Sequence, residues 1–246
     1  MSRGLQVVIP MAGEGKRFAD RGYTFAKPLI SIRGKPMIQW VLESLNLPEA
    51  SYTFVVRSEH RQQYALEDMI HQLVYQYRLV DQQMPLKGAA DTVLQAVQQL
   101  DSDDELLIVN SDQWVVWDPK QTLDEIHNSA ADGAILTFPS VHPKWSFAKP
   151  TEGWNNWTVE RVAEKVPISG LATAGIYWFK SVQLYAEAAK MMMAEPAKML
   201  RGEYYVCPVY NELIDHGKRV IHRPVGEMWG LGTPEDLEEF KMKICR

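Results

Sequence analysis

The stretch Leu5-Gln-Val-Val-Ile-Pro-Met-Ala-Gly-Glu-Gly-Lys-Arg-Phe18 decides the fold class. Its first five residues form a short apolar run that ends at a proline, which is typical of a buried strand. A glycine-rich turn follows, and open α/β sheets bind ligands at the carboxyl ends of their strands. Gly13 and Gly15 let a phosphate approach the backbone, and Lys16 and Arg17 supply positive charge. The turn predicts a phosphate-binding loop, and a plain tight turn with two solvated basic residues is the alternative.

Two better-known phosphate loops do not match this turn. A Walker A loop requires a glycine five residues before Gly15, where Pro10 stands, and a Ser or Thr where Arg17 stands. A dinucleotide fingerprint requires a third glycine or alanine, and Phe18 occupies that place. The sequence therefore favours a third kind of phosphate loop.

Strand-like and helix-like stretches alternate through the first 140 residues. This alternation predicts a mostly parallel sheet with helices on both faces. The expected strands are residues 5–9, 29–32, 52–56, 106–109 and 134–138, and the expected helices are 36–45, 60–72, 90–100 and 122–131.

The regular alternation of strand-like and helix-like stretches ends after residue 140. Trp145, Trp154 and Trp157 surround Gly153 and two asparagines, which predicts a hairpin and its turn. We expect these tryptophans to pack the hairpin more than to stack on a ligand. Further strands are expected at 158–166 and 172–179, and helices at 181–193, 209–216 and 234–244. We expect a single α/β domain over residues 1–246, with a nucleotide-binding half (1–140) and a small acceptor-binding half (141–246).

Composition excludes several classes of protein. The 246 residues include 26 Lys and Arg against 31 Asp and Glu, a net charge of −5, which argues against nucleic acid as a partner. An apolar run of about 18 residues is missing, so no membrane-spanning helix is expected. The two cysteines, Cys207 and Cys245, form no C-x-x-C motif, so the cytoplasm is the expected compartment.

An ordered series of motifs resembles the sugar-1-phosphate nucleotidyltransferase superfamily. The series consists of Pro10-Met-Ala-Gly-x-Gly-x-Arg-Phe18, Lys27-Pro-Leu-Ile30, Gly34-Lys-Pro-Met-Ile38, Asn110-Ser-Asp-Gln113, Glu164-Lys165 before Ala172-Thr-Ala-Gly-Ile-Tyr177, and Gly232-Thr-Pro-Glu-Asp-Leu237. It spans roughly residues 5 to 240, and the likeness is closest to short bacterial members linked to capsule and surface-polysaccharide synthesis, which include cytidylyltransferases.

The resemblance implies a GT-A-like nucleotidyltransferase fold and a reaction between an NTP and a small phosphorylated acceptor that releases pyrophosphate. A pyrimidine NTP, CTP or UTP, is favoured, and a homo-oligomer is left open. The implied catalytic residues are Arg17, Lys27, Asp112 and Lys165. The implied nucleotide-binding residues are Met11, Ala12, Gly13, Gly15, Lys16, Arg17, Lys27, Gln82, Gln83, Gly88, Ser111 and Asp112. The implied acceptor-binding residues are Glu164, Lys165, Gly175 and Asn211.

The implied cofactor is Mg²⁺, with Asp112 at the end of an apolar strand as its expected protein ligand. Asp112 as a helix N-cap is the alternative. The family usually has a second aspartate where this chain has Gly230. Either Asp112 binds the metal ion with only phosphate oxygens and water as further ligands, or another acid such as Glu227 takes the place of the missing aspartate. Because this acid is missing, the alternative that the protein is a non-catalytic paralogue also stays open.

A glycosyltransferase on a similar fold is a further alternative. Those enzymes usually bind their metal through D-x-D, and here Asn110 stands in place of the first acid. Release of pyrophosphate rather than NDP would separate the two classes.

Overall fold

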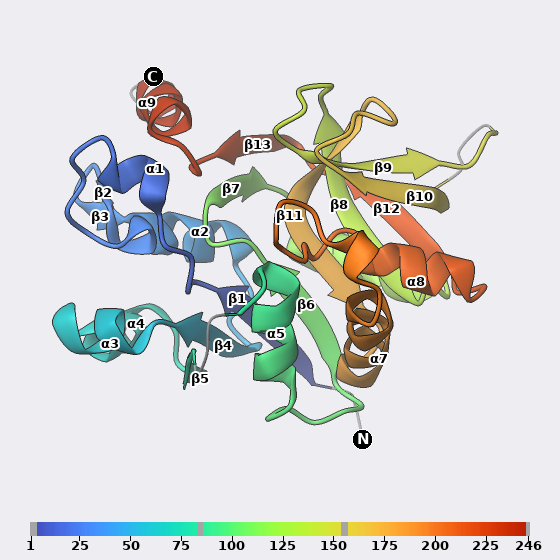
Figure 1. The fold of residues 1–246 in the computed structure, drawn as a ribbon, viewed down its shortest axis with the longest axis horizontal. Coiled ribbons are helices and arrows are strands. Elements are labelled where there is room, and N and C mark those ends of the chain that lie inside the picture. Colours follow the sequence, from blue (N-terminus) through green and yellow to red (C-terminus); the bar gives the residue numbers. More distant parts are fainter. Residues whose placement is uncertain (1–3, 83–85, 154–156, 245–246) are drawn as a thin grey trace.

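The computed structural model describes residues 4–82, 86–153 and 157–244 (Figure 1). Four strands of the first half lie side by side and parallel: β1 (Leu5–Pro10) pairs with β4 (Ser51–Val56) and with β6 (Glu105–Val109), and β4 pairs with β5 (Tyr77–Asp81). Parallel order brings the carboxyl ends of β1, β4 and β6 to one edge of the sheet. The predicted phosphate loop leaves the sheet at that edge.

The second half continues the same sheet mainly in antiparallel fashion. The long strand β11 (Leu171–Phe179) pairs antiparallel with β6, β8 (Gly133–Pro139) and β9 (Ser146–Pro150). The predicted hairpin is formed by β9 and β10 (Val159–Glu164), and β12 (Val220–Pro224) runs parallel to β8. The result is one nine-stranded mixed sheet, which confirms the expected fold class.

Helices cover both faces of this sheet (Figure 1). Strand alternation sends Val8 to one face, where it meets α5 (Ala89–Val97), α7 (Val182–Met193) and α8 (Val209–Asp215). Val7 and Ile9 face the opposite side, with α2 (Met37–Leu45), α4 (Leu66–Leu73) and α6 (Pro119–Asn128). None of the helices in the described ranges is long and apolar enough to cross a bilayer.

Two small two-stranded sheets and two helices form a separate unit beside the main sheet. The strands β7 (Gln113–Val116) and β13 (Glu227–Gly230) pair antiparallel, and β2 (Ser31–Ile32) pairs with β3 (Lys35–Pro36). Its separate apolar core joins α1 (Lys16–Ala19) and α9 (Pro234–Lys243) through Phe18, Leu237 and Phe240. The short 3₁₀ helices are η1 (Lys27–Leu29) and η2 (Pro196–Lys198).

Several boundaries differ from the sequence predictions. The helix expected at 60–72 is two helices, α3 (Ser58–Gln63) and α4, because Ala65 has a left-handed φ of 46°. The strand expected at 29–32 begins as the 3₁₀ turn η1. The helix expected at 122–131 starts earlier, because Asp118 caps Pro119 onward by accepting a hydrogen bond from Gln121 N. The strands β5, β7, β12 and β13 were not expected.

Candidate active site

A cleft of about 1250 Å³ opens at the carboxyl ends of β1, β4 and β6 and continues to the β9–β10 hairpin. Both halves of the chain line it. Of the predicted site residues, the cleft brings together Met11, Ala12, Gly13, Gly15, Lys16, Arg17, Lys27, Gln82, Gly88, Ser111, Asp112, Glu164 and Lys165. Gln83 lies outside the described residues. The fold therefore brings most of the predicted nucleotide-binding residues and two of the four predicted acceptor-binding residues into one cleft.

The glycine loop is held at both of its ends. Met11 N donates to Val55 O at 2.8 Å, which ties the start of the loop to β4. Gly15 precedes α1 in a left-handed conformation with φ 64°, and a Cβ there would lie 3.3 Å from Lys27 Cβ. Gly15 thus permits both the turn and the close approach of Lys27. Lys16 pairs with Glu14 at 2.8 Å on the exposed rim.

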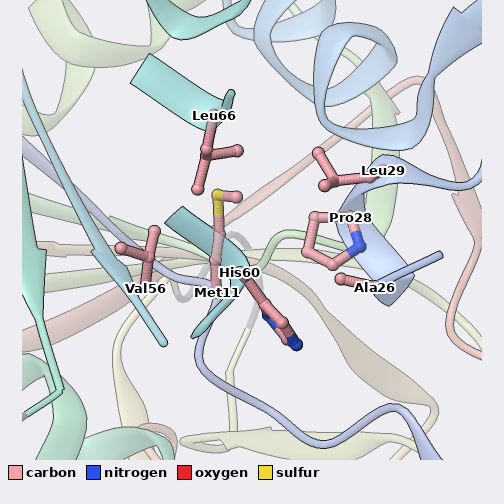
Figure 2. Close-up of a pocket in the computed structure, with 7 residues that line it drawn as sticks. All are labelled: Met11, Ala26, Pro28, Leu29, Val56, His60 and Leu66. Atoms are coloured by element: carbon pink, nitrogen blue, oxygen red, sulfur yellow. The ribbon is translucent and has the colours of Figure 1, made fainter. Parts of the chain in front are cut away.

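A small apolar pocket supports the segment that carries Lys27. Figure 2 shows Met11 at the centre of this pocket, with Val56, Leu66 and Leu29 around it. Met11 is only 4% exposed, and its side chain lies among these apolar residues. Pro28 is buried in the same place, which fixes the direction of the preceding lysine.

Lys27 and Asp112 form an ion pair at the floor of the cleft. Lys27 Nζ lies 2.7 Å from Asp112 Oδ2, and the two side chains are 20% and 24% exposed. Asp112 sits in the turn between β6 and the strand β7. No helix starts there, so the helix N-cap alternative for Asp112 is wrong. A Cβ at Gly232 would lie 2.8 Å from Asp112 Oδ2, so glycine at that position leaves the carboxylate its space.

The ring of Trp145 fills the space beside Gly230. Gly230 pairs with Gln113 between β13 and β7, and a Cβ there would lie 2.7 Å from Trp145 Cη2. Glu227 is exposed and paired with Lys243 at 3.0 Å, away from the cleft, so substitution by Glu227 does not fit. The nearer acid is Asp236, whose Oδ2 lies 3.5 Å from the same Cβ position.

The donor groups fit a magnesium ion that enters together with a nucleotide. Within the described ranges, no cluster of three or more His, Cys, Asp or Glu side chains is arranged to hold a metal. Mg²⁺ commonly takes one or two carboxylates and completes its shell with phosphate oxygens and water. Asp112 offers a carboxylate oxygen to the cleft next to the predicted triphosphate loop, which suits that arrangement.

The segment that holds the predicted nucleotide-binding residue Gly88 packs against the chain at Tyr204. Gly88 precedes α5 with φ 101°, and a Cβ there would lie 2.6 Å from Tyr204 O. Ala90 N donates to Tyr204 O at 3.0 Å, and Tyr204 N donates to Lys87 O. Gln82 N donates to Val56 O at 2.8 Å, which continues β5 along β4. Glycine at position 88 therefore allows two chain segments to pack backbone to backbone.

Glu164 and Lys165, the predicted acceptor-binding pair, line the far part of the cleft. Glu164 is largely buried and accepts a short hydrogen bond from Ser146 Oγ. Burial raises the pKa of Glu164 above 4.5, against the opposing effects of Ser146 and Lys165. Lys165 has a left-handed φ of 57°, a strained conformation that tends to persist at functional sites. Its Nζ donates to the Tyr205 hydroxyl at 2.6 Å.

Two predicted acceptor residues are absent from the cleft lining. A Cβ at Gly175 would lie 1.5 Å from Gln113 Oε1, so this glycine makes room for Gln113 and Asn110. Asn211 uses both ends of its amide on the backbone of Val162, at 3.0 and 3.1 Å. Neither residue reaches the cleft, so the acceptor contacts expected of Gly175 and Asn211 are wrong.

The sequence predictions missed Arg57, Asn110 and Lys144, all of which line the cleft. Arg57 and Asn110 directly follow β4 and β6, so the rule that identified the first glycine loop would have found them. Trp145 packs edge-on against Phe138 and also lines the cleft, whereas Trp157 packs on His222 and Arg223. Trp154 lies outside the described residues.

Comparison with known proteins shows the family of the chain. The family model for nucleotidyl transferases matches residues 6–246. A bifunctional protein GlmU from Desulfitobacterium hafniense is 26% identical over 213 residues, which cover 82% of this chain and 43% of that protein. This chain spans about half the length of the curated relatives it matches.

Solved structures show the same architecture. A nucleoside-diphosphate-sugar pyrophosphorylase from Vibrio cholerae is 28% identical, with a TM-score of 0.83 over 96% of this chain and 99% of that chain. A UDP-glucose pyrophosphorylase complexed with UDP-glucose is 17% identical, with a TM-score of 0.80 over 98% of each chain, and shows the fold alone. The family match over nearly the whole length, together with the shared fold, establishes that this chain belongs to the nucleotidyl transferase family.

Proposed function

We propose that the protein transfers a nucleotidyl group from an NTP to a small phosphorylated acceptor and releases pyrophosphate. The observation that carries this proposal is the ion pair between Lys27 and Asp112. It lies in the cleft between the glycine loop and the Glu164–Lys165 end. A cation for phosphate and a carboxylate for a metal thus stand where the two substrates would meet.

The reaction needs little covalent help from the protein. An oxygen of the acceptor phosphate attacks the α-phosphorus of the NTP, the bond from that phosphorus to the bridging oxygen breaks, and pyrophosphate leaves with the electron pair. A phosphate nucleophile is already ionised near neutral pH, so no general base is required. Catalysis then depends on positioning and on neutralisation of charge.

Each end of the cleft has a role in that scheme. Arg17 and Lys27 bind the β- and γ-phosphates and stabilise the leaving pyrophosphate, and Lys165 binds the acceptor phosphate. The Glu164 carboxyl, held by Ser146, hydrogen-bonds polar groups of the acceptor. When bound, Mg²⁺ supplies further neutralisation of phosphate charge, with Asp112 as its protein ligand.

The finer assignment rests on the motifs and the relatives. The motif series favours a pyrimidine NTP, CTP or UTP, and precursor synthesis for capsule or surface polysaccharide. The name of the Vibrio cholerae relative, a nucleoside-diphosphate-sugar pyrophosphorylase, supports a sugar phosphate as the acceptor. Ser146, Thr173 and Tyr177 line the acceptor end with hydroxyl groups, which suits a polar acceptor.

The test is a pyrophosphate-release assay on the purified chain. ATP, CTP, GTP and UTP are each combined with Mg²⁺ and with a panel of sugar 1-phosphates and small non-sugar phosphomonoesters. We expect one pyrimidine NTP and one acceptor to give pyrophosphate and a nucleoside-diphosphate product in equal amounts. Release of NDP from a nucleotide sugar would show a glycosyltransferase instead. Nucleotide binding without turnover for any pair would show a non-catalytic paralogue.

A further inference from the structure

Lys144 is a basic side chain in the cleft that the motifs do not account for. Its Nζ lies 2.5 Å from Asp236 Oδ1, and the two side chains are 37% and 11% exposed. The same Nζ lies 4.6 Å from the centre of the Trp145 ring. Both partners also line the cleft. Two neighbours therefore hold the ammonium group at the wall of the cleft while leaving part of it accessible.

The place of Lys144 depends on the glycine at position 230. The Trp145 ring packs edge-on against Phe138, with 5.6 Å between ring centres. Its Cη2 atom approaches to 2.7 Å from where a Cβ of Gly230 would stand. Any side chain at position 230 would push this ring away and move the lysine next to it. The position at which the family has a second acid is thus occupied by the Lys144–Trp145 segment.

This segment joins the two parts of the reaction centre. On one side, Trp145 O accepts a hydrogen bond from Lys165 N at 3.0 Å. On the other side, Gly230 is followed by Leu231, whose N–H donates to Asp112 O at 2.7 Å. The backbone next to Lys144 is thus tied to the lysine expected to bind the acceptor phosphate, and the residue after Gly230 is tied to the backbone of Asp112.

The negative charge of the two phosphates explains why a lysine suits this part of the cleft. Two phosphate groups must approach each other there, and their repulsion has to be offset. A second carboxylate would need a metal ion to reverse its charge, whereas an ammonium group offsets phosphate directly and donates hydrogen bonds. In the free protein, Asp236 balances Lys144, and a phosphate would take over part of that contact.

We propose that Lys144 contacts the acceptor phosphate and supplies positive charge where the acceptor phosphate meets the α-phosphate, in place of the second acid replaced by Gly230. The proposal deepens the nucleotidyl-transfer function and rests on it. The competing interpretation is a structural clamp, in which the Lys144–Asp236 pair only fastens the loop after β8 to α9.

Four variants separate these interpretations. Lys144→Ala removes the charge, and Lys144→Arg keeps it. Asp236→Asn breaks the ion pair but leaves the lysine in the cleft. Lys149→Ala is the matched control, because Lys149 lies five residues further on, in β9, and pairs with Glu160 on the exposed hairpin, outside the cleft.

The decisive measurement is binding of inorganic phosphate by calorimetry, with tripolyphosphate as the second probe, because both are read without turnover. We expect Lys144→Ala to weaken inorganic phosphate binding about tenfold or more, while tripolyphosphate, held by the glycine loop, changes less than about twofold. Lys144→Arg and Asp236→Asn should keep phosphate binding within about threefold of the wild type. Lys149→Ala should change neither affinity.

Equal behaviour of Lys144→Ala and Asp236→Asn, with lowered thermal stability and unchanged phosphate affinity, would overturn the proposal in favour of a clamp. Turnover gives a second reading: with an active substrate pair, Lys144→Ala should lower kcat roughly 30-fold or more, and Lys144→Arg should recover most of it. Absence of pyrophosphate release by the wild type would refute the proposed function, and the phosphate-binding comparison would still decide the role of Lys144.

Discussion

The cleft contains two lysine–aspartate pairs that reach it by different routes. Lys27 and Asp112 come from segments that follow the ordered glycine loop and the buried strand β6. Lys144 and Asp236 come from a loop after β8 and from the first turn of α9, 92 residues apart in sequence. The first pair belongs to recognisable motifs of the nucleotide side. Both pairs join distant segments, 85 and 92 residues apart, but Lys144 belongs to no motif, and its surroundings depend on how Trp145 packs beside Gly230.

The strongest test of the nucleotide side is Asp112→Asn. The substitution keeps size and hydrogen bonding but removes the negative charge that a Mg²⁺ ligand provides. We expect turnover to fall roughly 10³-fold with an unchanged fold. Circular dichroism and steady-state kinetics over a Mg²⁺ titration measure the two effects.

Asp118→Asn is its control, because Asp118 is a true helix N-cap that accepts a hydrogen bond from Gln121 N at 2.9 Å. Asn caps a helix as well as Asp, so this variant should stay fully active. Full activity of Asp112→Asn at every Mg²⁺ concentration would remove the metal role from the nucleotide side.

Charge removal at the triphosphate loop should have the next largest effect. Arg17→Ala and Lys27→Ala should each lower kcat/KM roughly 10²-fold, because each removes a cation from a site where phosphate charge develops. Arg21→Ala is the control: Arg21 pairs with Glu235 on the exposed surface and does not line the cleft. Wild-type kinetics for both loop variants would contradict the assignment of the triphosphate.

The acceptor side is tested separately by Lys165→Ala. Its ammonium group donates to Tyr205 and lies 3.7 Å from Glu164, away from the glycine loop. We expect KM for the acceptor to rise about tenfold or more, while calorimetric affinity for the NTP changes less than about twofold. Lost NTP affinity with unchanged use of the acceptor would mean that the two sides are not separable in this way.

The smallest expected effect concerns the buried carboxyl of Glu164. Burial raises its pKa in the folded protein above 4.5, so the folded state holds this proton more tightly than the unfolded state does. The resulting contribution to stability is present below pH 4.5 and is lost as the pH rises through the raised pKa. Its size is about 1.4 kcal/mol for each unit by which the pKa is raised.

Glu164→Gln removes this titration while the amide oxygen still accepts from Ser146. Urea unfolding between pH 4 and pH 8 should therefore show that the variant gains stability relative to the wild type as the pH rises. A difference in stability that stays constant across this range would show that the Glu164 pKa is not raised.

The sequence predicted regular elements best where short-range patterns decide them. The continuously apolar residues 106–109 and the alternating faces of residues 5–9 are strands as expected. The break at Ala65 was not visible in the pattern, because a left-handed alanine is imposed by packing and not by local preference. The strands β7 and β13 were missed for a similar reason, since each is short and is stabilised by the other.

Within the cleft, the sequence by itself pointed to the glycine loop, and its resemblance to the nucleotidyltransferase superfamily pointed to Lys27, Asp112 and the Glu164–Lys165 pair, because each lies in a motif of that series. Tertiary structure alone decided that Asn211 binds the backbone of Val162 and that Gly230 gives its space to Trp145. Those outcomes depend on contacts between residues 49 or more positions apart. A local pattern reports which groups a segment offers, whereas the packing of distant segments decides which of those groups face the cleft.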